Sequence, residues 1–452
     1  MVDISETIVA IATPPGRGAI GLVRVSGPLV KNIIMAVLKS TLPPRISTLC
    51  KFHDEDSRII DEGLAVFFQA PASFTGEDVL EIYTHGSRVV LDLLVKNIIR
   101  QGARQARPGE FTERAFHNNK LDLVQAEAVA ALIDASSEQA ARSAMRSLEG
   151  EFSRQVDILL KNLIEIRVYV ESALDFPDEE TDIFSEKKIT EKLQQCLVNL
   201  ESIKAKAKQG AILKEGATAV IIGRPNAGKS TLLNQLAGKE AAIVTEIPGT
   251  TRDLVTQDIL LDGIPLHIID TAGLRSSHDK IEQEGMRRAL DAAERADIVI
   301  VMNEYNQTPD EEERKMMENI KRSKHLVVLK NKIDLHNVEP DIRHINEMDI
   351  EILLSAKTGK GIDLFVSSLK KFLGVQDLQE DLFMARSRHL DALERVGRAL
   401  QHAMENMENK INRVELMAED LRISQQALGE ITGEFASDDL LGEIFSTFCI
   451  GK

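Results

Sequence analysis

The stretch Gly223-Arg-Pro-Asn-Ala-Gly-Lys-Ser230 fits the pattern of a phosphate-binding loop, in which four residues separate a glycine from Gly-Lys-Ser. It follows an apolar run at residues 220–222 and precedes a helix-like run at residues 231–236, so a strand leads in and a helix leads out. Glycines let backbone N–H groups converge on phosphate oxygens, and the helix N-terminus adds its positive end. Lys229 would neutralise phosphate charge, and the Ser230 hydroxyl would bind Mg²⁺.

Strands alternate with helices around this loop, from about residue 216 to residue 373. Asp262-Gly263 marks a hairpin turn within the block. Alternation of this kind predicts a mainly parallel sheet covered by helices on both faces, an α/β fold. The expected strands lie at residues 219–222, 266–269, 298–301, 326–329 and 350–353.

Three further motifs follow in the order that a guanine-nucleotide-binding (G) domain needs. Thr250-Thr251 lie in a loop after the first helix, where a threonine can sense Mg²⁺ and the γ-phosphate. In Asp270-Thr-Ala-Gly273, Asp270 would hold Mg²⁺ through water and the N–H of Gly273 would contact the γ-phosphate. In Asn331-Lys-Ile-Asp334, the carboxylate can accept two hydrogens from a guanine edge that adenine does not present, which argues against an ATPase. Ser355-Ala-Lys357 would complete the base pocket.

Each motif alone has an ordinary loop as its alternative, but four in order at strand ends predict a GTP site. Mg²⁺ would be held by Ser230 and Thr251. The predicted GTP-binding residues are Asn226, Ala227, Gly228, Lys229, Ser230, Thr231, Thr245, Glu246, Ile247, Pro248, Gly249, Thr250, Thr251, Asp270, Thr271, Ala272, Gly273, Asn331, Lys332, Asp334, Ser355, Ala356 and Lys357.

Leu274 stands where many small GTPases carry a glutamine that orients the attacking water. A leucine cannot position water, so another group must do so. Glu282 and Glu284 are acidic candidates downstream, although a solvated helix residue is the ordinary interpretation of either one.

Composition limits what the rest of the chain can be. At 452 residues, with 43% hydrophobic and 28% charged residues, it should fold as about three domains. No apolar run approaches the ~18 residues of a membrane span, and the start lacks the pattern of a signal peptide, so we expect a cytoplasmic protein. Cys50, Cys196 and Cys449 show neither disulfide nor zinc-ligand spacing.

The formal net charge of −16 opposes non-specific binding to nucleic acid. A nucleic-acid partner would need a local basic patch or a second protein. Arg100, Arg104 and Arg107 form one candidate patch, with a solvated face as the alternative.

The two flanks of the α/β block differ from it and from each other. Short apolar runs among turn signals predict an α+β domain before residue 119. Helical spacing follows, as in Leu159, Leu160, Leu163, Ile164 and Val168, and it returns after about residue 381, as in Leu390, Leu393, Val396, Leu400 and Met404. The expected domains are residues 1–118, 119–215, 216–375 and 376–452.

The ends of the chain resemble one family closely. Near the C-terminus the segments are Gly429-Glu-Ile-Thr-Gly-Glu-Phe435, Asp438-Asp-Leu-Leu-Gly-Glu443 and Phe448-Cys-Ile-Gly-Lys452. In the first domain they are Phe74-Thr-Gly-Glu-Asp-Val-Leu-Glu81 and Arg107-Pro-Gly-Glu-Phe-Thr-Glu-Arg-Ala-Phe116. Together they resemble the MnmE (TrmE) family of bacterial tRNA-modification GTPases over essentially the whole chain. The resemblance implies a G domain inserted in a helical domain, with an N-terminal domain that binds tetrahydrofolate and dimerises.

The resemblance also implies a reaction and a partner. Family members work with the FAD-containing flavoprotein MnmG (GidA), as a heterotetramer, and add an aminomethyl or carboxymethylaminomethyl group at C5 of the wobble uridine of certain tRNAs. The implied folate, 5-formyl-tetrahydrofolate or a related one, would contact Arg24, Glu81, Lys120 and Lys452. Read alone, the first three would be surface charges. Cys449 would be a buried small apolar residue, and a role beside the folate is implied only by its motif.

For the missing glutamine, the family pattern implies a K⁺ ion that takes the place of an arginine finger. Asn226, Thr245, Ile247 and Thr250 would hold K⁺, and Glu282 would orient the water. Pro248 departs from the family loop and should stiffen it.

The competing interpretation is a ribosome-assembly GTPase, a binding switch without modification chemistry. Such proteins usually carry an RNA-binding module. The one GXXG, at residues 18–21, lacks the basic centre and flanking helices of a KH domain.

Overall fold

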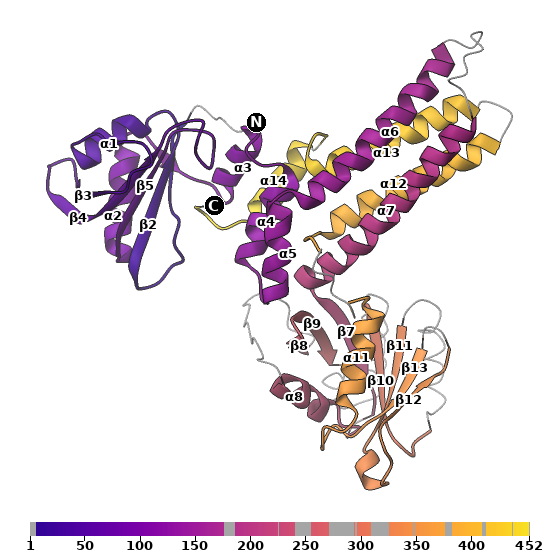
Figure 1. Ribbon diagram of the computed structural model, residues 1–452. Coiled ribbons are helices and arrows are strands. Elements are labelled where there is room, and N and C mark those ends of the chain that lie inside the picture. Colours follow the sequence, from indigo (N-terminus) through magenta and orange to yellow (C-terminus); the bar gives the residue numbers. More distant parts are fainter. Residues whose placement is uncertain are drawn as a thin grey trace, which may run out of the picture. The chain divides into compact units, whose positions relative to one another are not determined.

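The computed structural model describes residues 6–175, 186–224, 226–239, 255–270, 293, 296–308, 325–346, 349–375, 382–408, 413–435 and 437–451. The chain divides into two compact units, drawn in Figure 1. The terminal unit comprises Met1–Ala130, Ser147–Asn199 and Ala392–Lys452. The central unit comprises Ala131–Arg146 and Leu200–Asp391. The central unit therefore interrupts the terminal unit in sequence.

The terminal unit contains a six-stranded sheet in the order β3-β4-β5-β2-β1-β6. Two helices, α1 (Val30–Leu38) and α2 (Arg88–Arg100), pack on one face, where alternate strand residues such as Val23, Phe52 and Ile82 are buried. The α+β prediction is confirmed. The strands are β1 (Ile8–Ile11), β2 (Gly18–Ser26), β3 (Thr48–His53), β4 (Ile59–Phe68), β5 (Val79–Gly86) and β6 (Arg104–Gln105).

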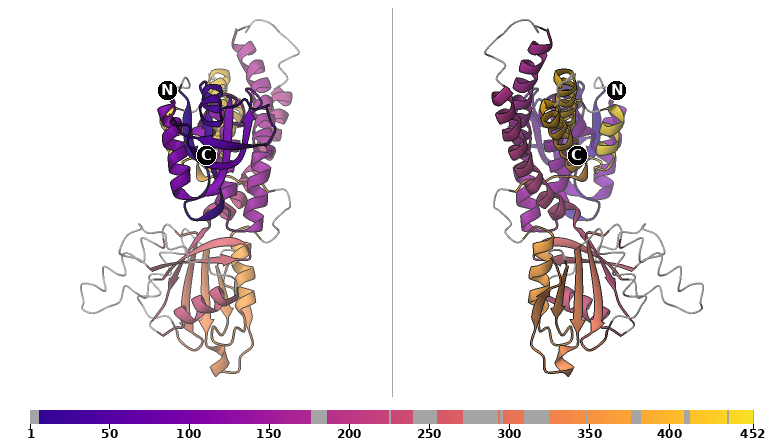
Figure 2. Two further views of the ribbon diagram at one scale, coloured as in Figure 1. Left: turned by 90° about the vertical axis from the view of Figure 1, so that its left-hand side faces the viewer. Right: turned by 90° about the vertical axis from the view of Figure 1, so that its right-hand side faces the viewer.

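Helices that precede and follow the α/β block in sequence pack together in the terminal unit. The long helices α6 (Glu151–Asp175) and α13 (Arg413–Thr432) lie side by side (Figures 1 and 2). The fold therefore joins the helical segments that precede and follow the α/β block, as the resemblance implies. Other helices with residues in this unit are α3 (Glu110–His117), α4 (Leu123–Ile133), α7 (Glu186–Glu215), α12 (Ser387–Glu408) and α14 (Asp438–Ser446).

The buried face predicted for helix α6 is only partly right. Leu159, Leu160 and Leu163 of α6 are buried as expected, but Ile164 and Val168 are 38% and 56% exposed. The buried stripe instead continues through Ile166 and Val170. An apolar residue on both sides of the stripe makes the 3.6-residue period ambiguous there.

The central unit contains a seven-stranded sheet in the order β12-β13-β11-β10-β7-β9-β8. The five inner strands pair in parallel, and β12 and β8 add antiparallel edges. This confirms the mainly parallel sheet and the hairpin turn at Asp262-Gly263. The strands are β7 (Ala217–Ile222), β8 (Val255–Leu261), β9 (Ile264–Asp270), β10 (Ile298–Glu304), β11 (His325–Asn331), β12 (Asp341–His344) and β13 (Asp349–Leu353).

Helices α8 (Lys229–Lys239) and α11 (Ile362–Phe372) pack on one face of this sheet (Figure 1). Leu232 and Phe365 of these helices join the strands in one apolar core. The other face buries Val220, Val299 and Val301. The short helix η2 (Ile333–Leu335) follows β11, and α5 (Glu138–Leu148) begins in this unit. Because β7, β11 and β13 are parallel, the loops after them meet at one edge.

No helix within the described ranges is long and apolar enough to span a membrane.

Candidate functional site

The phosphate loop joins β7 to α8, and its backbone takes conformations that favour glycine. Asn226 and Gly228 have φ of +65° and +105°. A Cβ on Gly223 would stand 2.2 Å from the Met302 carbonyl oxygen, and one on Gly228 would stand 2.2 Å from Asn331 Nδ2. Neighbouring strands therefore approach too closely for any larger residue at these two glycines.

Lys229 is held against the loop that precedes it. It is 5% exposed, and its Nζ donates to the carbonyl oxygens of Gly223 at 2.7 Å and Arg224 at 3.0 Å. Ser230 and Thr231 follow it in the first turn of α8 and are exposed. An ammonium and two hydroxyls thus gather at a helix N-terminus, an arrangement suited to phosphate oxygens.

Asn331 ties the phosphate loop to the predicted base loop. Its Nδ2 donates to the carbonyl oxygen of Ala227 at 2.7 Å, and its Oδ1 accepts from the backbone N–H of Ala356 at 2.9 Å. The side chain is buried at the end of β11. One amide therefore fixes the spacing between two loops that lie more than a hundred residues apart in sequence.

Asp334 is positioned by Ser355, another of the predicted base-pocket residues. The Ser355 hydroxyl donates to Asp334 Oδ1 at 2.6 Å. The ammonium of Lys332, whose backbone has φ of +66°, forms an ion pair with Glu304. Lys357 lies exposed two residues after Ser355. Glu304 was not predicted, although it ends β10 beside Asn331 in the register of the sheet.

Part of the predicted GTP site lies outside the described residues. The backbone of Asp270 ends β9 beside Ile221, which leads into the phosphate loop, but its side chain is not described. Other predicted residues outside the described ranges are Thr245, Glu246, Ile247, Pro248, Gly249, Thr250, Thr251, Thr271, Ala272, Gly273 and Glu282, with Leu274, Glu284 and Lys452.

A second cluster of predicted residues lies on the sheet of the terminal unit. Glu81 on β5 accepts from Arg24 Nε on β2 at 2.9 Å and from the Tyr83 hydroxyl at 2.7 Å. The Arg24 guanidinium also lies 5.7 Å from the ring centre of Phe74 and 5.8 Å from that of Phe111. Arg24 and Glu81 are therefore a partly buried pair and not separate surface charges.

Tyr83 was not predicted as part of this cluster. Burial, followed by the hydrogen bond and the charge of Glu81, raises the pKa of Tyr83 to about 12. The hydroxyl therefore keeps its proton at neutral pH and remains a donor to the carboxylate.

The C-terminal tail reaches the same cluster. The N–H of Gly109 donates to the carbonyl oxygen of Cys449 at 3.3 Å, and Arg24 Nη1 lies 3.5 Å from that of Gly451. Gly451 has φ of +95°, and a Cβ there would stand 2.4 Å from the Ile11 carbonyl oxygen. Cys449 is exposed, so its interpretation as a buried apolar residue is wrong.

Lys120 lies beside the loop that carries Phe74. Its Nζ donates to the carbonyl oxygen of Pro71 at 3.2 Å, and its stem passes Gly76. The neighbouring Asn118 donates to the carbonyl oxygen of Thr75 at 2.7 Å. The chain around residue 120 thus fixes this loop, and Lys120 itself is exposed.

The three arginines considered as a basic patch are each paired with a carboxylate. Arg100 lies 3.4 Å from Glu55, and Arg107 Nη2 lies 2.9 Å from Glu113 Oε2. Arg104 donates to Glu110 at 2.8 Å through Nη1 and contacts Glu6 as well. The carboxylates offset the positive charge, so these arginines do not form a basic surface.

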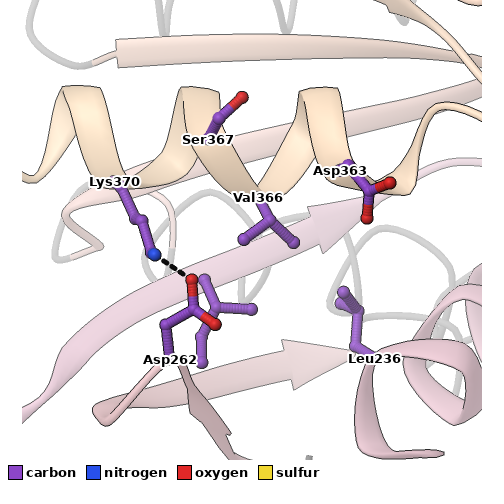
Figure 3. Close-up of a pocket in the computed structure, with 7 residues that line it drawn as sticks. Leu236, Asp262, Asp363, Val366, Ser367 and Lys370 are labelled. Carbon is purple, nitrogen blue, oxygen red and sulfur yellow. Dashed lines mark ion pairs between the residues drawn. The ribbon is translucent and has the colours of Figure 1, made fainter. Parts of the chain in front are cut away.

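A small pocket of about 250 Å³ lies on the helical face of the central unit (Figure 3). The ion pair of Lys370 on α11 with Asp262 at the hairpin turn closes one side of it. None of the predicted GTP-binding residues lines the pocket. The lining residues are Leu236, Leu261, Asp262, Asp363, Val366, Ser367 and Lys370.

Comparisons with known proteins match the chain over its whole length. Residues 7–120 match the family model for the GTP-binding protein TrmE N-terminus, and residues 123–449 match that for the MnmE helical domain. The curated "tRNA modification GTPase MnmE" of Vibrio parahaemolyticus is 51% identical over 453 residues, covering 99% of this chain and 100% of its own.

Two further relatives with the same name agree. That of Histophilus somni is 52% identical, and that of Coxiella burnetii is 51% identical. Both alignments cover 99% of this chain and 99% of the relative. The chain therefore belongs to the MnmE family of tRNA modification GTPases.

Proposed function

We propose that this chain hydrolyses GTP and takes part in modifying tRNA in the cytoplasm. The observation that supports the proposal best is the pair of hydrogen bonds by which Asn331 joins the phosphate loop to the base loop. The chain is also 51% identical to a tRNA modification GTPase over 99% of its length. The proposed domains are residues 1–118 for folate binding and dimerisation, 119–215 and 376–452 for the helical domain, and 216–375 for the G domain.

The described residues supply distinct roles at the proposed GTP site. Lys229 and the N–H groups at the start of α8 bind the β- and γ-phosphates. Asp334, oriented by Ser355, accepts hydrogen bonds from the two N–H donors of the guanine edge. Mg²⁺ would be held by Ser230 and Thr251, and when bound it neutralises phosphate charge.

The chain lacks a glutamine at residue 274, so we assign the orientation of water to Glu282. K⁺ would be held by Asn226, Thr245, Ile247 and Thr250. When bound it supplies the positive charge that an arginine finger gives elsewhere. Asn226 fits such a ligand because it is exposed in the phosphate loop and carries an amide oxygen.

Single-turnover hydrolysis of GTP by the purified chain tests this site. Hydrolysis should be fast in K⁺ and slow in Na⁺ at equal ionic strength, by a factor on the order of 10³ if the ion replaces an arginine finger. Asn226→Ala should lose most of the stimulation, and Glu282→Ala should slow hydrolysis without weakening nucleotide binding. Equal wild-type rates in the two salts would contradict the role of the ion, whereas a normal rate for Glu282→Ala would move the water-orienting role elsewhere.

The second cluster fits a tetrahydrofolate, 5-formyl-tetrahydrofolate or a related one. Glu81 offers a carboxylate to the N–H edge of a pterin ring, and Phe74 offers an aromatic face at 37% exposure. Arg24, Lys120 and Lys452 supply cations for the glutamate tail or formyl oxygen. Cys449 lies exposed in the tail beside the cluster, which supports a contact with this ligand.

We infer further that the chain is a homodimer and forms a heterotetramer with the FAD-containing flavoprotein MnmG (GidA). The open face of the terminal sheet supports dimerisation, because Leu49 and Leu64 pair across β3 and β4 with 67% and 44% exposure. With this partner and tRNA, the complex would add an aminomethyl or carboxymethylaminomethyl group at C5 of the wobble uridine. Purified chain and flavoprotein, mixed with unmodified tRNA and GTP, should form the product. No product with an active flavoprotein would contradict the assignment.

A further inference from the structure

We propose that Tyr83 is a positioning residue for the folate site, holding the Glu81 carboxylate in the orientation that reads the pterin edge. This inference rests on the proposed folate function, and it assigns a role to a residue that neither the motifs nor the family resemblance indicated.

The register of the sheet places Tyr83 in a row of apolar side chains that runs across neighbouring strands. Glu81 lies in the next row on the same face of the sheet. Tyr83 pairs with Leu64 on β4 and with Leu22 on β2. Glu81 is two residues away on the same strand and pairs with Arg24. Residues two apart on a strand share a face, so the phenol reaches along β5 from the apolar row to the carboxylate.

The two oxygens of Glu81 have different partners. Oε1 accepts from Arg24, at 2.9 Å from Nε and 2.8 Å from Nη2. Oε2 accepts from the Tyr83 hydroxyl at 2.7 Å. A guanidinium on one oxygen and a hydroxyl on the other fix the carboxylate plane. Oε1 therefore already accepts two hydrogen bonds, whereas Oε2 has a lone pair left, which suits an N–H donor from a ligand.

A neutral donor matters because the carboxylate must stay negative enough to bind the ligand. A second cation on Oε2 would compete with the pterin donors, whereas a hydroxyl orients the oxygen and keeps its charge. Because burial and Glu81 raise the pKa of Tyr83 to about 12, its hydroxyl keeps its proton at neutral pH and remains the donor to Oε2. Loss of the hydroxyl should let the carboxylate rotate toward Arg24 and cost affinity.

Titration with 5-formyl-tetrahydrofolate by isothermal calorimetry tests the inference in a double-mutant cycle on the full chain. The variants are Tyr83→Phe, Glu81→Gln and the double substitution. Tyr169→Phe, on α6, is the matched control because its ring contacts Lys192 and lies in a helix outside the sheet. GTP hydrolysis and thermal unfolding of each variant report on the fold independently of folate.

We expect Tyr83→Phe to weaken folate binding by about tenfold, the scale of one hydrogen bond to a charged group. In the Glu81→Gln background the same change should have little further effect, because Tyr83 acts through that carboxylate. Tyr169→Phe should bind like the wild type, and all variants should hydrolyse GTP normally.

Wild-type affinity in Tyr83→Phe, or a full tenfold effect that persists in the Glu81→Gln background, would overturn the role of Tyr83 alone. If the wild-type chain binds no folate, or Glu81→Gln binds as tightly as the wild type, the folate assignment itself fails, and the inference fails with it.

Discussion

The two carboxylates assigned to base-like ligands each accept a hydrogen bond from a hydroxyl, and Glu81 is also paired with Arg24. Ser355 donates to Asp334 at 2.6 Å, and Tyr83 donates to Glu81 at 2.7 Å. A hydroxyl fixes the direction of a carboxylate without cancelling its charge, so lone pairs remain for the N–H donors of a ring. Residues that set the geometry of a carboxylate are thus as much a part of recognition as the carboxylate itself.

Asp334→Asn should weaken GTP binding by about tenfold or more, because losing a hydrogen bond to a charged group costs about 1.5 to 3 kcal/mol. The Asn amide has one acceptor oxygen and an NH2 donor, so the variant should bind xanthosine triphosphate, whose ring carries a carbonyl acceptor in place of the guanine amino group, better than GTP. Equilibrium binding of both nucleotides measures the change, with the exposed Asp341→Asn as control. Unchanged GTP affinity in Asp334→Asn would remove this residue from the base pocket.

At this scale the sequence indicates candidate residues but not their contacts. The motifs indicate Asp334 and Ser355 because the order of strands and loops is written in local patterns. They cannot indicate the ion pair of Lys332 with Glu304, since it depends on which strand lies beside β11. The pairing of Arg104 with Glu6, which lies 98 residues away, was missed for the same reason. Tyr83 was missed although Glu81 is only two residues away on β5, because no motif marks a tyrosine as a donor to a carboxylate.

At the scale of elements, parallel strands bring the motifs of the central unit together. β7 and β11 flank β10, and their carboxyl ends carry the phosphate loop and the base loop. Periodicity predicted all five inner strands because buried parallel strands are continuous apolar runs. It was less successful on α6, where apolar residues lie on both sides of the buried stripe.

In the terminal unit, α3 is anchored by the buried carboxylate of Glu110 at its first residue. Burial alone would raise the pKa of Glu110, but hydrogen bonds from Arg104, from the N–H of Arg107 and from Arg114 lower it to about 2. In the unfolded chain this carboxyl titrates near its ordinary value of 4.5. The ionised Glu110 carboxylate and its arginine partners therefore stabilise the fold above pH 4.5, and this stabilisation is lost as the pH falls toward 2.

Glu110→Gln should lower the free energy of unfolding of the terminal unit by about 3 kcal/mol at pH 7, because it removes a buried carboxylate that pairs with Arg104 and Arg114. The difference in free energy of unfolding between Glu110→Gln and the wild type should become smaller at pH 4 and below, because the stabilisation by the ionised carboxylate is lost there. Pulsed hydrogen exchange in urea, read on peptides from residues 18–26 and 110–117, measures it. The exposed Glu138→Gln is the control, expected to change stability by less than about 0.5 kcal/mol. A pH-independent difference would contradict the depressed pKa of Glu110.

At the scale of the whole molecule, the last residues of the chain return to its first strands. The tail at residues 449–451 contacts Gly109 and Arg24 within the terminal unit, while the phosphate loop belongs to the central unit. Sequence alone showed two helical blocks, and only the family resemblance implied that they pack together. The contact of α6 with α13 agrees with that implication.

Deleting residues 449–452 should therefore abolish tRNA modification and leave GTP hydrolysis within about twofold of the wild type, as expected for changes in separate, uncoupled sites. Cells carrying only the truncated chain, analysed for modified wobble uridine, provide the test. Purified truncated protein, assayed for GTP hydrolysis, is the matching control. Normal modification in those cells would show that the tail is dispensable and would weaken the folate assignment.

We propose that this chain is required for modification at C5 of the wobble uridine. Mass spectrometry of bulk tRNA nucleosides, from cells lacking the gene and from the same cells carrying it on a plasmid, tests this requirement. We expect aminomethyl-type and carboxymethylaminomethyl-type uridines to disappear in the first sample and to return in the second. Unchanged levels of these nucleosides in cells lacking the gene would contradict it and would instead fit a GTPase that acts in ribosome assembly.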